Sequence, residues 1–442
     1  MKSRIFLVWM LFGLLNHLST AQWQRLIFQY NGDCRVLHYD SLSTSLIVGG
    51  WFSQMNGISA NKIINWDFSS WAPMDSGAPY GTPIYNLFQY QGAIFSSAIM
   101  RKYPDGKDRW LYAWNGANWD TTLGSFNGAV NAASLSNGVL GLSGGFDSIS
   151  NQHCSRVALW DGSQWECLDL PTDWGLVTAL AYYQNHWYAG GNFYDTLTGI
   201  HDLERWNGSA FESFGSALLS PGIDYVASMA VFQNELFISG VFHAGNGLPD
   251  DFIMRWDGQT LRDVGGGLNA QAFQLKVYKN HLYALGAFSN AGGIPVNQFA
   301  KWNGTQWSEV IPGMTTDLGI SDFCFAGGDL FIGGAFNVIN GDTLPIVARY
   351  VGYDLLLKNE QLNDLKPGCE VEYVNGNAVV QCSQLLEGFI IVWDAQGKRI
   401  MRREIRQGQC VLPMQACVPG LYLLQLEAQD GRSATLKFIK PG

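Results

Sequence analysis

Five aspartates offer the most direct chemistry in this chain. They lie on loops of a repeated pattern: Asp147, Asp195, Asp250, Asp251 and Asp342. Carboxylates on neighbouring loops bind calcium, or act in pairs as the acid and base of glycoside cleavage. Aspartate also caps turns and solvates a loop rim, which is the interpretation we favour. We therefore treat the five as candidate ligand-contacting residues and assign no catalytic residue.

The seven histidines form no recognisable constellation. His186 and His281 each follow the asparagine of a tight turn, which favours a structural role. His153, His201 and His243 fall in or beside longer loops of different units, where convergence on one face is a hypothesis. The chain has no H-E-x-x-H or P-loop motif and no zinc-type Cys/His spacing. We expect neither a cofactor nor a metal.

Eight cysteines suit an oxidising compartment, where disulfides form. In CEVEYVNGNAVVQC an Asn-Gly turn sets a hairpin register in which Cys369 faces Cys382. That position is a non-hydrogen-bonded pair, where the two Cα atoms are closest, so we predict a disulfide. Cys410 and Cys417 are a weaker candidate pair. We expect the other four to be buried thiols: Cys34, Cys154, Cys167 and Cys324.

A repeated aromatic landmark reveals the elements that position these residues. Strings such as LWDGSQW (159–165) and KWNGTQW (301–307) recur along the chain. The aligned aromatic residues are 46 to 50 residues apart: Trp66, Trp114, Trp160, Trp206, Trp256, Trp302 and Tyr350. A string like L-Y-x-G-G-x-F precedes the aromatic residue in six of the seven units, and the second unit has diverged. This period is the length of a four-stranded propeller blade.

Each unit divides into four short strands, a to d. In the fifth unit they are YVASMAVF, ELFISGVF, FIMRW and TLRDV. Tight turns join a to b and c to d, and the Asp-Gly or Asn-Gly of the second turn tolerates φ > 0. The glycines of strand b allow close backbone approach near the axis. The longer d–a and b–c connections share the other face, here named the long-loop face, where we expect a ligand.

These features predict an all-β chain, a seven-bladed β-propeller over residues 22–357 followed by a small C-terminal β-sandwich over residues 358–442. The segment QWQRL, residues 22–26, is expected to supply strand d of the last blade and so fasten it to the first. Six or eight blades are alternatives if the second unit is misassigned. Alternating strands and polar turns favour the sandwich.

The first 21 residues read as a secretory signal peptide, with Lys2 and Arg4 ahead of an apolar stretch from Ile5 to Leu15. That stretch is shorter than the roughly 20 residues that span a bilayer, so we expect no integral membrane segment in the mature chain. The net charge of −10, without a basic cluster, argues against nucleic acid as a partner. We expect a monomer that is secreted or held at the outer-membrane cell surface.

The repeated units are similar to kelch-type and galactose-oxidase-type propeller repeats, and to repeats of secreted Rax2-like surface proteins. The resemblance rests on the L-Y-x-G-G-x-F and W-N-G-x-x-W strings and covers roughly residues 22–357. Galactose oxidase needs copper ligands from tyrosine and histidine, and no matching constellation occurs here. The resemblance therefore implies architecture only.

The C-terminal segment, residues 388–442, resembles the type A sorting domain of the type IX secretion system of Bacteroidota. The matching strings are I-x-V-x-D-x-x-G-K, P-G-L-Y-L-L-Q-L and K-F-I-K, with motif residues Asp394, Gly397, Gly420, Tyr422, Lys437 and Lys440. The family's Y-P-N-P entry is absent, which leaves the start of the domain unfixed. The resemblance implies that the type IX machinery recognises this domain for export and that the domain is then removed.

The sequence thus favours a binding protein that takes a glycan or protein ligand on its long-loop face. An extracellular carbohydrate-active enzyme using the loop carboxylates is one alternative, and a structural or adhesive surface protein is another. A carboxylate pair around the central channel would favour the enzyme. Exposed aromatic side chains without such a pair would favour binding.

Overall fold

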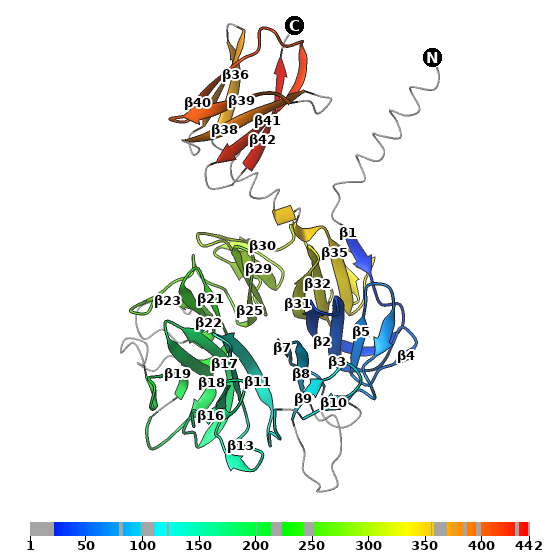
Figure 1. The fold of residues 1–442 in the computed structure, drawn as a ribbon, viewed down its shortest axis with the longest axis vertical. Helices are drawn as coiled ribbons and strands as arrows, with labels where there is room; N and C mark the ends of the chain where they lie inside the picture. Colours follow the sequence, from blue (N-terminus) through cyan, green and yellow to red (C-terminus); the bar gives the residue numbers. More distant parts are fainter. Residues whose placement is uncertain are drawn as a thin grey trace. The chain divides into compact units, whose positions relative to one another are not determined.

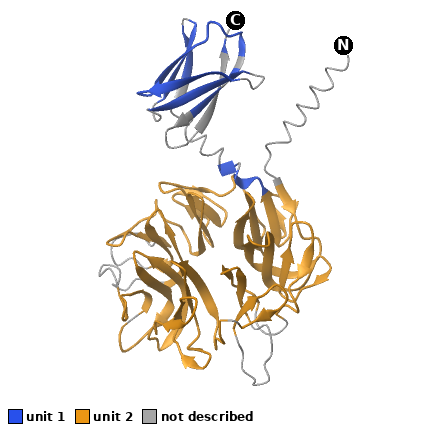
Figure 2. Cartoon of the chain, viewed as in Figure 1, with its two compact units in different colours: residues 1–22, 351–442 blue, residues 23–350 orange. Residues whose placement is uncertain are grey.

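The computed structural model divides into two compact units, residues 23–350 and residues 1–22 with 351–442 (Figure 2). The predicted signal peptide, residues 1–21, lies outside the described residues. The structure describes residues 22–78, 83–98, 110–121, 123–199, 201–213, 223–242, 252–354, 356–357, 369–374, 376–382, 387–394, 399–428 and 433–440.

The larger unit repeats one four-stranded antiparallel sheet along the chain (Figure 1). Consecutive sheet strands pair in order, as predicted for strands a to d. The first sheet contains β2 (Tyr30–Asp40), β3 (Ser45–Met55), β5 (Ile63–Trp66) and β6 (Trp71–Pro73), with β4 (Ile58–Ser59) beside β3. The second contains β7 (Leu87–Tyr90), β8 (Ala93–Ser97), β9 (Leu111–Trp114) and β10 (Trp119–Asp120). The diverged second unit therefore forms a sheet of the same kind.

The third to sixth sheets follow the same order. The third contains β11 (Val130–Ser136), β12 (Val139–Gly144), β15 (Val157–Trp160) and β16 (Trp165–Cys167). The fourth contains β17 (Trp174–Tyr183), β18 (His186–Tyr194), β19 (His201–Trp206) and β20 (Phe211–Glu212). The fifth contains β21 (Ile223–Phe232), β22 (Glu235–Phe242), β23 (Ile253–Trp256) and β24 (Leu261–Arg262). The sixth contains β25 (Ala272–Tyr278), β26 (His281–Gly286), β29 (Phe299–Trp302) and β30 (Trp307–Glu309).

The seventh sheet joins the two ends of this unit. It contains β31 (Ile320–Ala326), β32 (Asp329–Gly334), β35 (Val347–Val351) and, from the N-terminal side, β1 (Gln22–Arg25). The pairing of β1 with β35 confirms the role predicted for QWQRL. First strands of neighbouring sheets touch, as β11 touches β17, β17 touches β21 and β21 touches β25. Because β2 contacts both β7 and β31, the series returns to its start, an arrangement consistent with a β-propeller (Figure 1).

Asp322 on β31 connects the sheets at this closure. Its Oδ2 accepts the Leu37 N–H of β2 at 2.7 Å, and its Oδ1 accepts Nζ of Lys276 from β25 at 2.6 Å. The aspartate is only 1% exposed. Burial, followed by the charge of Lys276, lowers the pKa of the nearby His38 to about 4, so that imidazole is neutral at pH 7. The Asp322 carboxylate therefore acts structurally, with both oxygens engaged.

The recurring Trp-Asp-Gly string closes the outer hairpin of a sheet. In the third sheet Gly162 has φ +103°, as the predicted turn requires. The aspartate has a second role that the sequence analysis missed, because Oδ1 of Asp161 accepts the Gln164 N–H at 2.9 Å. The following Trp165 donates its indole N–H to the carbonyl oxygen of Leu123 at 2.8 Å. This bond ties the outer strand to the segment that precedes the sheet.

A glycine near the end of strand b permits close contact with strand a. A Cβ built on Gly144 of β12 would lie 2.0 Å from the carbonyl oxygen of Ala129, and one on Gly240 of β22 would lie 2.0 Å from that of Tyr225. The register of β11 shifts at the same level, between Val130 and Ala132. The predicted need for backbone approach at these glycines is confirmed.

The C-terminal unit is one antiparallel sheet in the order β36-β37-β40-β39-β38-β41-β42. Its strands are β36 (Cys369–Val374), β37 (Asn377–Cys382), β38 (Glu387–Asp394), β39 (Arg399–Arg406), β40 (Gln409–Pro413), β41 (Gly420–Ala428) and β42 (Ser433–Lys440). A sandwich would have two separate sheets, here β36-β37-β40 and β39-β38-β41-β42. Instead, the pairing of Arg406 on β39 with Gln409 on β40 joins these two strand groups into one sheet. Buried side chains of both groups, such as Leu412 and Leu424, still form one core.

Candidate functional site

The long-loop face is formed where strand b ends and where strand a begins. Short hairpins occupy three of its b–c loops: β13 (Ser148–Ile149) with β14 (Gln152–His153), β27 (Asn290–Ala291) with β28 (Ile294–Pro295), and β33 (Val338–Ile339) with β34 (Asp342–Thr343). These hairpins hold the loops in defined positions, so the candidate residues on them can be placed.

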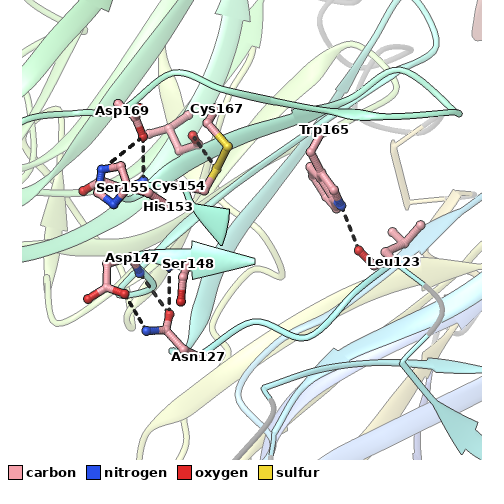
Figure 3. The surroundings of a disulfide bond; sticks show 11 residues. Leu123, Asn127, Asp147, Ser148, His153, Cys154, Ser155, Trp165, Cys167 and Asp169 are labelled. Carbon is pink, nitrogen blue, oxygen red and sulfur yellow. Dashed lines mark hydrogen bonds and ion pairs between the residues drawn. A yellow bond between two sulfur atoms is a disulfide. The ribbon is translucent and has the colours of Figure 1, made fainter. Parts of the chain in front are cut away.

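Asp147 is held within its own loop region. Its Oδ1 accepts a hydrogen bond from Nδ2 of Asn127 at 2.5 Å (Figure 3). The Oδ1 of Asn127 in turn accepts the backbone N–H groups of Asp147 and Ser148, both at 3.0 Å. The amide and carboxylate thus fasten the d–a connection to the b–c hairpin. This arrangement is the turn-stabilising role that we favoured for the aspartates.

Asp195 also caps a turn. Its Oδ1 accepts the Leu197 N–H at 3.1 Å and the N–H and hydroxyl of Thr198, both at 2.6 Å. These hydrogen bonds, led by the one from the threonine hydroxyl, lower the pKa of Asp195. Asp342 is exposed on β34. Asp250 and Asp251 lie outside the described residues. Among the three aspartates that the structure describes, no hydrogen bond joins any two.

The histidines of this face lie on different sheets. His153 Nε2 is 3.7 Å from Oδ1 of Asp169, and both side chains are exposed. His201 Nδ1 is 3.2 Å from Oδ2 of Asp202 on β19. His243 lies outside the described residues. Within the described part of the chain, no group of three or more His, Cys, Asp or Glu side chains is arranged to hold a metal ion.

A disulfide joins Cys154 to Cys167 in the third sheet (Figure 3). The expectation that both are buried thiols is therefore wrong. Hairpin counting missed the bond because the register sets Ala158 opposite Cys167. The chain before β15 instead folds back, with Cys154 N–H donating to the Asp147 carbonyl oxygen at 2.9 Å. The bond anchors the b–c loop to the outer strand.

The remaining cysteines divide into two groups. Cys410 and Cys417 are free, so their proposed pairing is wrong, and Cys34 and Cys324 are free thiols as expected. The hairpin register places Cys369 opposite Cys382, and Cys382 is disulfide-bonded. Both facts support the predicted bridge, but the Cys369 side chain lies outside the described part of the structure.

An exposed aromatic pair lies on the long-loop face of the fourth sheet. Trp174 is 54% exposed and Tyr194 is 37% exposed. They are cross-strand partners at the ends of β17 and β18, with ring centroids 6.5 Å apart. Leu176 and Leu197 add exposed apolar surface beside them. The sequence analysis missed this pair because it searched the loops for carboxylates, although both rings flank the glycine-rich end of strand b.

Other exposed aromatic side chains share this face. Tyr30 and Trp51 lie at the corresponding ends of β2 and β3, and Phe273 lies at the start of β25. Trp51 is 53% exposed and has Nζ of Lys62 over its ring at 5.4 Å. Large apolar groups in water are the informative exception to burial. Their presence on the loop face marks it as a candidate binding surface.

Glu204 on β19 is a buried carboxylate next to this surface. It is 0% exposed, and its Oε1 accepts the His201 N–H at 3.2 Å and the Ser213 hydroxyl at 3.1 Å. Its Oε2 has no hydrogen-bond partner among the residues that the structure describes. Burial raises the pKa of Glu204 to about 7. The corresponding residues of the other sheets are not acidic: Ile64, Tyr112, Ala158, Met254, Ala300 and Ala348.

The sorting-motif residues that the structure describes lie on three adjacent strands of the C-terminal unit. Asp394 on β38 is opposite Tyr422 on β41, and Gly420 is opposite Lys440 on β42. Tyr422 is 3% exposed and donates its hydroxyl to the Val418 carbonyl oxygen at 2.7 Å. Lys437 belongs to β42, and Gly397 lies outside the described residues. Whether this sheet is recognised for export stays a prediction.

Comparison with known proteins gives structural similarity but no sequence family. No family model matches the chain, and no curated protein matches it. Among solved structures, the computationally designed Ika8 protein is 15% identical, with 94% of this chain and 100% of that chain covered and a TM-score of 0.43. In the described part of the chain, no helix is long and apolar enough to cross a membrane.

Two further solved structures are of bacterial proteins. One is PorZ of Porphyromonas gingivalis, a surface component of its type IX secretion system, which is 11% identical with a TM-score of 0.43. The match covers 92% of this chain and 59% of PorZ. The extracellular domain of BT4673 from B. thetaiotaomicron is 10% identical with a TM-score of 0.46, and 96% of this chain covers 58% of it. This chain therefore spans less than two thirds of either. The fold assignment rests on the strand order of the sheets.

Proposed function

We propose that this chain is an exported, seven-bladed β-propeller that binds an extracellular glycan on its long-loop face. The observation that carries the proposal is the exposed pair Trp174 and Tyr194, whose rings lie 6.5 Å apart on that face. Aromatic faces bind the apolar C–H faces of sugars, and a large ring held by a rigid strand loses little entropy on binding.

The neighbouring carboxylates support binding over hydrolysis. The Oδ1 of Asp195 accepts the Thr198 N–H of its own turn at 2.6 Å, and the Oδ2 of Asp173 accepts the Thr196 N–H at 2.8 Å. Hydrolysis of a glycosidic bond needs two carboxyl groups flanking the bond, one as acid and one as base or nucleophile. Asp173 and Asp195 are already bonded to backbone N–H groups of their turns, so neither is placed to act on a sugar. The contact surface for a ligand is therefore the aromatic pair.

The export route is the second part of the proposal. The predicted signal peptide would direct the chain across the inner membrane, and the C-terminal unit would be the domain recognised by the type IX machinery. The protein would then be released or held at the cell surface as a monomer. In a Bacteroidota host with type IX secretion, removal of residues 358–442 should leave the chain in the periplasm, and its appearance outside the cell would contradict this route.

Binding is tested with the full chain on a panel of immobilised polysaccharides, measuring both retention and released sugar. Trp174→Ala should weaken retention about tenfold, which corresponds to about 1.4 kcal/mol. Leu42→Ala is the control, because Leu42 is 71% exposed in the β2–β3 turn, away from the long-loop face. Retention unchanged by Trp174→Ala would contradict the proposed surface, and release of sugar would favour the enzyme instead.

A further inference from the structure

A cavity of about 540 Å³ lies between the third and fourth sheets, away from the long-loop face. Its lining includes Asn137 from the β11–β12 turn and Asp161 and Gln164 from the β15–β16 turn. Tyr182 and Trp187, on either side of the β17–β18 turn, complete one wall. These turns all belong to the a–b and c–d connections, so the cavity opens on the opposite, tight-turn face. Its volume is in the range of small-molecule sites.

The interior of this cavity is aromatic and apolar. Tyr182 and Trp187 have ring centroids 5.1 Å apart and are contributed by the fourth sheet. Leu159 and Trp165 line it from the third sheet. Trp187 is 6% exposed and Leu159 is 7% exposed, so these side chains are fixed by packing. A rigid aromatic wall of this kind suits the C–H face of a pyranose ring.

The rim is polar and carries an unpaired carboxylate. In the fourth sheet Glu212 is opposite Arg205, and the two form an ion pair. The equivalent residues of the third sheet are Glu166 and Leu159. Because leucine replaces the arginine, Glu166 forms no ion pair within the described residues and stands exposed at the cavity mouth. Compared with the fourth sheet, the third sheet therefore lacks this ion-pair partner where the cavity opens.

A similar departure occurs at the turn above the cavity. In the fourth and fifth sheets a turn glutamine reaches the next sheet, as Gln184 Nε2 donates to the Asp257 carbonyl oxygen at 3.1 Å and Gln233 Nε2 to that of Asn303 at 3.5 Å. The third sheet has Asn137 at this position, with a shorter side chain. Its amide makes no hydrogen bond to the fourth sheet in the described structure and can donate to a ligand.

We propose that this cavity binds a neutral hexopyranose unit, independently of the long-loop face. The aromatic wall takes the C–H face of the sugar, while Asn137, Gln164 and Glu166 exchange hydrogen bonds with its hydroxyl groups. No Lys, Arg or His occurs among the residues lining the cavity in the described structure, and two carboxylates do. The two carboxylates, Asp161 and Glu166, therefore repel an anionic sugar. They also offer charged acceptors to the hydroxyl groups of a neutral sugar.

The test uses the full chain and saturation-transfer NMR with methyl glycosides of glucose, galactose and mannose, and with glucuronate and glucosamine as charged comparators. Glu166→Ala should weaken binding of the neutral glycoside about tenfold by removing the acceptor. Gln164→Trp, at an exposed turn, should abolish binding by filling the cavity mouth. Glu212→Ala, at the equivalent position of the fourth sheet, is the matched control, and circular dichroism checks that each variant is folded.

The outcomes separate this site from the long-loop face. Loss of binding in the two cavity variants, with Trp174→Ala and Glu212→Ala unchanged, supports the proposal. Binding lost in Trp174→Ala but retained in both cavity variants assigns the sugar to the long-loop face and overturns the proposal. It is equally overturned if no neutral glycoside binds or if only a charged sugar binds, and neither result removes polysaccharide binding at Trp174.

Discussion

Glu204→Gln should make the stability of the propeller less dependent on pH. The wild-type carboxyl is fully buried, and within the described part of the chain its Oε2 has no hydrogen-bond partner. Ionisation places a charge in a position that is apolar in most other sheets. Burial accordingly raises the pKa of Glu204 from 4.5 to about 7 in the folded chain.

The sign and magnitude follow from linkage. Below pH 4.5 the carboxyl is protonated in both states, so it contributes no pH dependence. Between pH 4.5 and about 7 the folded state binds more protons than the unfolded state, so the free energy of unfolding falls as the pH rises. Each unit of pKa shift corresponds to 1.36 kcal/mol, which gives a total loss of about 3 kcal/mol by pH 8.

Urea unfolding of wild type and variant at pH 5, 6, 7 and 8 measures this difference through tryptophan emission. The glutamine amide meets the same lack of partners as Oε2, which lowers the stability of the variant by a constant of about 1–3 kcal/mol. The informative quantity is therefore the change in their difference with pH, which should move by about 2–3 kcal/mol in favour of the variant between pH 5 and pH 8.

Glu212→Gln is the control for this experiment, because Glu212 lies in the adjacent strand and Arg205 lowers its pKa. A lowered pKa stabilises the folded state above the unfolded value, so this variant should show a small effect of opposite sign. Parallel pH profiles of wild type and Glu204→Gln would refute the reasoning and show that Glu204 ionises without penalty.

Three further substitutions test the fold. Asp322→Asn removes the buried partner of Lys276 and should lower the free energy of unfolding by about 3 kcal/mol, measured by urea unfolding at pH 7; an unchanged midpoint would show that the contact is dispensable. The double variant Cys154→Ser with Cys167→Ser should lose about 3 kcal/mol under oxidising conditions only, and equal losses in the reduced proteins would argue against the disulfide. Gly144→Ala places a Cβ 2.0 Å from a backbone oxygen and should lower Tm by several degrees, whereas a stable variant would contradict the backbone-approach explanation.

The repeat explains why so much of the fold could be read from the sequence. Tryptophans spaced by one blade length located the sheets, and the position of QWQRL directly ahead of the first unit correctly placed β1 beside β35. Both inferences use local patterns that recur, so errors in one unit are corrected by the others. The hairpin register of Cys369 and Cys382 was predictable for a related reason, because an Asn-Gly turn fixes its own pairing.

Residues that depend on the path of a loop were not predictable in this way. The disulfide of Cys154 needs the chain before β15 to double back, which strand counting does not reveal. The aromatic pair at Trp174 depends on β17 and β18 extending past the point where the equivalent strands of the second, third, sixth and seventh sheets end. The joining of the C-terminal strands through Arg406 depends on a turn that continues the ladder, so two predicted sheets became one.

A repeat also provides an internal control for function. The seven sheets have the same strand order and pack against their neighbours in the same way. A residue that differs in type from the equivalent residues of the other sheets is therefore not explained by packing alone. Glu204 places a carboxylate where the other sheets have no acid, and Leu159 removes the ion-pair partner that Glu166 would have. Both departures lie in the third and fourth sheets, between which the cavity opens, and Trp174 is exposed on the fourth sheet. At the cavity, Glu166 lacks an ion pair that the equivalent residue of the fourth sheet retains, and a ligand that binds there would account for this departure.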